Sequence, residues 1–185
     1  MRRFVLTLLA AWPLAAQAAA PSLDPETGLA TWQAETDGIQ VRLTQISPDQ
    51  ARAFYQARGF SAEAAERYAS ECVFMTVVRN VGDASIRHRL ADWRYGHAGK
   101  TLPIRSKTEW ERRWKKLGVN ETARIAFTWA QFPATQTFEP GDWNQGMTTY
   151  HVPRGERFTL RFVWRAGGRT FSGTLDEVQC AAETP

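Results

Sequence analysis

Short segments in which apolar and polar residues alternate run through most of the chain, and they constrain its fold more than any other feature. In the first, residues 38–44, the apolar residues Ile39, Val41 and Leu43 are separated by polar ones. A period of two is the pattern of a β-strand that buries one face. Such segments recur at roughly 10- to 20-residue spacing, without the regular strand–helix alternation of a parallel sheet. The later ones cover residues 86–93, 123–132, 147–152, 158–164 and the stretch from 171 onward.

Three other segments have the period of a helix. Ser47-Pro48-Asp49-Gln50 is a capping-box sequence with proline at the first helical position, and it predicts a helix that ends at Gly59. A second helix is expected from Ser61 to Tyr68, and a third from Thr108 to Leu117. The third helix would be basic on its outer side, but it is short, so we expect it to pack on the domain rather than on a membrane.

The order of these segments predicts a mainly β, antiparallel, immunoglobulin-like β-sandwich with a short helical insertion after its first strand and a second short helix. A partly open barrel is the alternative. Residues 73–78 are apolar on both faces, so this strand is expected at the centre of a sheet. Residues 21–37 are rich in proline, glycine and acidic side chains and predict an N-terminal arm. Residues 38–185 would then form a single domain.

The first 20 residues have the anatomy of a secretory signal peptide. Arg2 and Arg3 precede an apolar stretch over residues 4–14, and alanines near residues 16–20 offer a cleavage site. The apolar stretch is too short to span a membrane. We therefore expect export to a bacterial periplasm or beyond, and not an integral membrane protein.

The charge of the chain argues against a nucleic-acid partner. The 185 residues include 23 Lys and Arg against 19 Asp and Glu, a formal net charge of +4. Removal of Arg2 and Arg3 with the signal peptide would leave 21 basic residues and a net charge of +2. Proteins that bind nucleic acids carry a more concentrated basic charge.

The chain has two cysteines, Cys72 and Cys180, which fit an oxidising compartment. A redox-active pair would usually lie close together in the sequence, as in Cys-x-x-Cys, and these two do not. The expected role is therefore a structural disulfide between the start of a central strand and the last strand.

No pattern in the sequence indicates an enzyme. The three histidines are His88, His97 and His151, and the sequence has no Gly-x-Ser-x-Gly elbow, phosphate loop or dinucleotide fingerprint. His88 shares its strand face with Ile86 and Leu90, which indicates a core position. Asp92 and Asp142 could be paired for glycoside chemistry, but any chain with this many acidic residues allows such a pair. We expect no catalytic residues.

A copper site is the alternative hypothesis. Asp92-Trp93 and Asp142-Trp143 each lead, through a glycine, to a residue that can ligate metal, His97 in one case and Met147 in the other. Met147 and His151 lie four residues apart on a predicted strand and would share its outer face. Imidazole and thioether ligands together favour copper, so His97, Met147 and His151 would make this protein a periplasmic copper carrier.

A binding surface is the preferred hypothesis. Arg157, Arg161 and Arg165 alternate with the apolar residues of one strand, and Arg87 and Arg89 could extend the same basic face. Arginine and tryptophan contribute strongly to protein interfaces, and Trp143, on an expected loop, is the aromatic residue expected to be most exposed. These residues predict a non-enzymatic accessory protein, without a cofactor, that binds a protein or cell-envelope partner.

Overall fold

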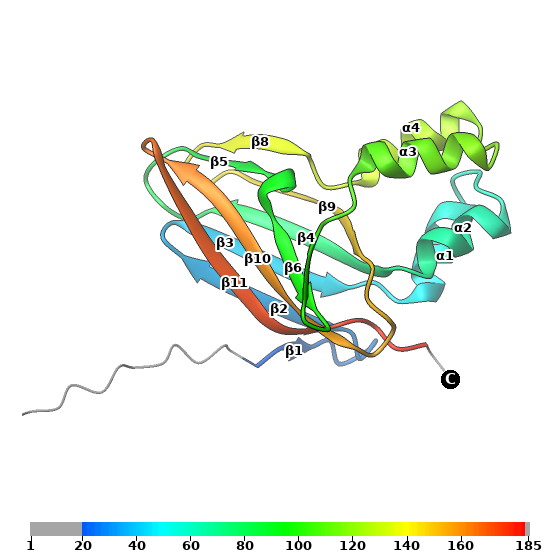
Figure 1. The fold of residues 1–185 in the computed structure, drawn as a ribbon, viewed down its shortest axis with the longest axis horizontal. Helices are drawn as coiled ribbons and strands as arrows, with labels where there is room; N and C mark the ends of the chain where they lie inside the picture. The colour runs from blue at the N-terminus through cyan, green and yellow to red at the C-terminus, as the bar shows by residue number, and fades with distance from the viewer. Residues whose placement is uncertain (1–19, 184–185) are drawn as a thin grey trace, which may run out of the picture.

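The computed structural model describes residues 20–183, which form two packed antiparallel sheets and four short α-helices (Figure 1). The prediction of a mainly β fold is confirmed. Residues 1–19 of the expected signal peptide lie outside the described residues. In the first sheet the strand order is β1-β2-β3-β4-β9. Their bounds are β1 Ser22–Leu23, β2 Ala30–Thr36, β3 Ile39–Gln45, β4 Cys72–Asn80 and β9 Trp143–Tyr150.

The second sheet is organised around one long strand, β10 (Arg157–Ala166). On one side β10 pairs with β11 (Arg169–Gln179), and on the other it pairs successively with β6 and β5. The 3₁₀ helix η1 (Leu90–Asp92) separates these two short strands. The remaining bounds are β5 Ile86–Arg89, β6 Arg94–His97, β7 Lys100–Pro103 and β8 Thr135–Phe138.

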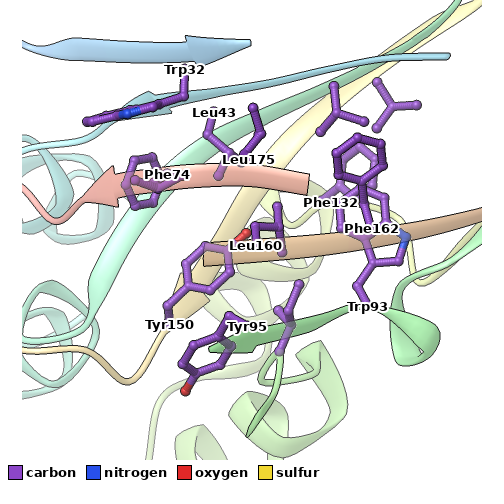
Figure 2. Close-up of a cluster of buried hydrophobic side chains, with 14 of the residues drawn as sticks. Trp32, Leu43, Phe74, Trp93, Tyr95, Phe132, Tyr150, Leu160, Phe162 and Leu175 are labelled. Atoms are coloured by element: carbon purple, nitrogen blue, oxygen red, sulfur yellow. The ribbon is translucent and has the colours of Figure 1, made fainter. Parts of the chain in front are cut away.

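The main hydrophobic core lies between the two sheets (Figure 2). Alternate residues of β10 enter it, as its sequence pattern predicts, and Leu160 and Phe162 are completely buried there. Phe74 and Tyr150 of the first sheet pack against Phe158 from the opposite side. Many contacts in this core are therefore between aromatic rings, some edge to face and others tilted or stacked.

The predicted disulfide is present and joins the two sheets. Cys72 begins β4, Cys180 directly follows β11, and their Cα atoms lie 5.3 Å apart. Both residues are buried within the main core. The bond thus holds the end of one sheet against the end of the other.

Residues 21–37 differ from the expected arm, because residues 30–36 form β2 and pair with β3 along its length. Trp32 is buried in the main core, so this segment packs against the rest of the domain. Its polar composition does not predict this packing. The first helical insertion consequently follows the third strand of the chain rather than the first.

The three predicted helices are confirmed within a residue or two. Their bounds are α1 Pro48–Gln56, α2 Ala62–Ala69 and α3 Lys107–Lys116. Ser47 and Gln50 form the expected capping box of α1, and Ser106 and Glu109 form another at α3. Each box satisfies backbone N–H groups that have no partner within the helix.

The predicted strand over residues 123–132 is wrong, because residues 121–130 form the helix α4 (Glu121–Ala130). Asn120 caps this helix by accepting a hydrogen bond from the Ala123 N–H. Ala123 and Phe127, four residues apart, face inward, whereas Ile125 and Trp129 are 52% and 85% exposed. The alternation of apolar residues in the sequence therefore does not correspond to a buried strand face.

All four helices pack together beside the first sheet and form a second hydrophobic core with it (Figure 1). Trp110 and Trp114 stack on each other, and they contact Tyr68 and Phe127. Val73, Met75 and Met147 of strands β4 and β9 close this core from the sheet side. The helices thus cover part of the outer face of the first sheet.

The second sheet contains a buried histidine, as the sequence predicts. His88 on β5 is 1% exposed and contacts the rings of Trp93, Phe132 and Phe138. Within residues 20–183 neither ring nitrogen has a hydrogen-bond partner. Burial lowers the pKa of His88 from 6.5 to about 4, because the apolar surroundings disfavour the charged ring.

We expect His88 to make stability depend on pH. Its pKa is lower in the folded state, so its contribution is complete above pH 6.5 and is lost as pH falls towards 4. The loss should reach about 3 kcal/mol, at about 1.4 kcal/mol for each tenfold change in proton affinity. Urea denaturation of the wild type and His88→Phe across this range measures the difference. Parallel pH profiles of the two proteins would contradict the prediction.

Removal of the disulfide should strongly destabilise the fold. The bond joins residues 108 positions apart, and constraining a loop of that size in the unfolded chain is worth about 4–5 kcal/mol. Denaturant titration of the double variant Cys72→Ser with Cys180→Ser measures this loss. Reduced wild-type protein serves as the control and should unfold at a similar denaturant concentration. Unchanged stability of the variant under oxidising conditions would be inconsistent with this role.

Candidate functional site

The three residues of the copper hypothesis lie in different surroundings. Met147 is 4% exposed, and its sulfur accepts a hydrogen bond from the Tyr55 hydroxyl at 3.3 Å. The expectation that it lies on an exposed outer face is wrong, because the helices cover that face. Its role is to pack the second core.

The two histidines have separate carboxylate partners. The Nε2 of His97 lies 3.2 Å from Glu156, and the Nδ1 of His151 lies 3.3 Å from Glu71. Within residues 20–183 no group of three or more His, Cys, Asp and Glu residues could hold a metal ion. The arrangement of these residues therefore offers no support for a copper site.

The two Asp-Trp sequences also differ in structure. Trp93 is buried in the main core and donates a hydrogen bond to the Val163 carbonyl, whereas Trp143 is 59% exposed. Asp142 closes a turn by accepting a hydrogen bond from the Glu139 N–H. Their similarity reflects local turns rather than a shared ligand set.

Glu71 and Arg105 form an ion pair that the sequence does not reveal. Their side chains are 2.8 Å apart and largely buried, and Glu71 immediately precedes the disulfide residue Cys72. The hydroxyl of Tyr95 accepts a hydrogen bond from the nearby His151 N–H. This cluster connects β4, the segment before α3, and the end of β9, so we assign it a structural role.

The predicted arginine surface is present on the second sheet. Arg157, Arg161 and Arg165 are exposed on the outer face of β10, while the alternate residues Phe158, Leu160, Phe162 and Trp164 turn towards the core. Arg87 and Arg89 are exposed on β5, and Arg94 is half-buried on β6. We call these six residues the arginine face.

Within this face, arginines are paired directly across strands. Arg165 of β10 lies opposite Arg87 of β5, and Arg161 lies opposite Arg94 of β6. Directly opposed like charges destabilise an antiparallel sheet. The sequence cannot predict this pairing, since it depends on the register of strands more than sixty residues apart.

Few carboxylates balance these charges. Asp92 accepts a hydrogen bond from Arg89 at 2.6 Å and lies 3.8 Å from Arg165. The bond with Arg89 holds the pKa of Asp92 below its ordinary value. Arg157 pairs with Glu177, whereas Arg87 and Arg161 form no ion pair within the described part of the chain.

A small depression of about 110 Å³ lies on the arginine face. Its lining includes Arg87, Arg89 and Arg165, together with Asp92 and Val163. Three guanidinium groups around one depression can bind an anionic group through charge-assisted hydrogen bonds. This depression is the centre of the candidate site.

Trp143 does not belong to the arginine face. It lies on β9 of the first sheet, opposite Arg79, and not on a loop as expected. Because the inner faces of the two sheets meet in the core, their outward side chains lie on opposite sides of the molecule. Trp143 and the arginines therefore cannot form one contact surface, and Trp129 of α4 is more exposed than Trp143.

No protein-family model matches the chain, and no curated protein or solved structure does either. In residues 20–183 none of the helices has the length and apolar character needed to cross a membrane. The fold and the site together define a disulfide-linked, mainly β protein with an arginine-rich outer face.

The paired arginines give a prediction for stability. Replacing Arg87 with Glu places a carboxylate opposite Arg165, so the variant should gain roughly 1 kcal/mol in unfolding free energy at low salt. The gain should shrink at high salt because ions screen exposed charges.

The matched control for this measurement is Arg42→Glu. Arg42 is exposed on β3 and faces Gln33 and Val77 across the strands rather than an arginine. Thermal unfolding of both variants at two salt concentrations separates local relief of repulsion from a general effect of net charge. Equal gains in the two variants would refute the prediction.

Proposed function

We propose that this protein is an exported, non-enzymatic accessory protein that binds an anionic protein or envelope partner through its arginine face. The observation that carries the proposal is the direct pairing of Arg165 with Arg87 and of Arg161 with Arg94. An anionic partner would relieve the repulsion in both pairs at once. The free energy of repulsion between the paired arginines, which destabilises the free protein, would be recovered on binding and would strengthen the affinity for the partner.

Export is part of the proposal. The disulfide between Cys72 and Cys180 suits an oxidising compartment, and the sequence of residues 1–20 has the pattern of a signal peptide. Two packed antiparallel sheets support an immunoglobulin-like sandwich as the fold, a common scaffold for binding in such compartments.

A binding role also agrees with the state of the histidines. His88 is enclosed by aromatic rings, and His97 and His151 each pair with one carboxylate. Within residues 20–183 no hydrogen bond joins the ring of one of these histidines to a serine, threonine or cysteine, the pairing on which a catalytic triad depends.

The test measures binding of a defined polyanion, soluble poly-L-glutamate, by calorimetry. The double variant Arg161→Glu with Arg165→Glu should bind at least about tenfold more weakly, because it loses charge-assisted hydrogen bonds. The control, Arg42→Glu with Arg79→Glu, makes the same change in net charge on the first sheet and should keep most of the affinity.

The control variant decides the outcome. Equal weakening in both variants would show that only net charge matters and would overturn the proposal. Both variants must first be shown to be folded, which the exposed positions of all four arginines lead us to expect. The variant Arg161→Glu with Arg165→Glu should unfold at a higher temperature than the wild type, because each glutamate then faces an arginine.

A further inference from the structure

An apolar depression of about 460 Å³ lies beside the arginine face. It is bounded by η1, the end of β7 and the start of α3, and its apolar lining includes Leu90, Pro103, Ile104, Phe132 and Ala134. Ile104 and Phe132 belong to the main core, so the depression opens directly onto it. Its volume falls within the range of small-molecule binding sites.

The polar side chains inside the depression are already bonded. Ser106 and Glu109 bond to each other in the capping box of α3, and Thr135 donates to the His88 carbonyl. The hydrogen bonds from Ser106 also keep the pKa of Glu109 below its ordinary value. An occupant would find little to hydrogen-bond inside, which favours an alkyl chain over a peptide whose amide groups need partners.

The charged side chains that line the depression have a net positive charge. Lys107 and Arg89 are cationic, and Glu109 is the one carboxylate among them. Arg89 is paired with Asp92, whereas Lys107 forms no ion pair within residues 20–183. Arg89 also lines the smaller depression on the arginine face. Helix η1 stands between the two, with Leu90 and Ala91 lining the apolar side and Asp92 the basic side.

We propose that these adjoining depressions form one site for an anionic single-chain amphiphile. Its alkyl chain occupies the apolar depression, and its carboxylate or phosphate group lies between Lys107, Arg89 and the rest of the arginine face. This inference rests on the proposed function and narrows its anionic envelope partner to a lipid-like molecule. Burying the chain contributes apolar affinity, and the cations select the charge of the head group.

The test uses sodium laurate and dodecyl phosphate below their aggregation concentrations, with binding measured by calorimetry. At least one should bind with a stoichiometry near one, and the pair distinguishes a carboxylate head group from a phosphate. Dodecyltrimethylammonium, which has the same chain and the opposite charge, should bind at least about tenfold more weakly.

Pocket variants locate the binding. Ala134→Trp places a large side chain in the apolar depression and should weaken binding at least about tenfold, the effect of losing two buried methylene groups. Ala91→Trp blocks the same space from η1 and keeps the test intact if the first variant does not fold. Ala84→Trp, at an exposed loop position outside both depressions, is the matched control and should bind as the wild type does.

Charge reversal at the edge supplies the second readout. Lys107→Glu should lower the affinity for the anionic amphiphiles and raise that for dodecyltrimethylammonium. Failure of both anionic amphiphiles to bind, or equal binding by Ala134→Trp and Ala84→Trp, would overturn the inference. If poly-L-glutamate still depends on Arg161 and Arg165 in that case, the proposed function stands without the lipid site.

Discussion

Alternate side chains of β10 are buried between the two sheets, and this burial determines which side chains of the second sheet face the core and which face solvent. Leu160 and Phe162 can enter the core only in one register, because a shift of one residue would send them to the solvent and bury the arginines. The aromatic partners from the first sheet and the bond between Cys72 and Cys180 hold that register. The outward position of Arg161 and Arg165 is thus a consequence of core packing.

The helices divide the outer surfaces of the protein into two kinds. On the first sheet, Met147 and Val73 are covered by the helices and form a second core. On the second sheet, the outer face of β10 and β5 has no such cover within the described residues, and its arginines remain in contact with solvent. This asymmetry explains why Met147 is buried beneath the helices whereas the arginines of the second sheet are exposed to solvent.

Local patterns predicted most of the elements correctly, because alternation, capping boxes and the inward stripe of β10 are properties of a few adjacent residues. The strand predicted around Phe127 is wrong because Ile125, Phe127 and Trp129 alternate by chance, whereas the Asn120 cap and the four-residue spacing of Ala123 and Phe127 belong to a helix. The separation of Trp143 from the arginines could not be predicted, because strand order is set by long-range pairing. The apolar depression is likewise assembled from distant segments and leaves no local pattern.

The disulfide has a consequence for how the chain matures. If the protein is exported as proposed, Cys72 crosses the membrane well before Cys180, which lies near the C-terminus. Strand β9, which completes the first sheet, also emerges late. Neither sheet can close around the core until β9 and β11 have emerged, so the thiol of Cys72 has no partner over that interval. In an exported chain, oxidation of Cys72 would therefore follow the arrival of a residue 108 positions later in the sequence.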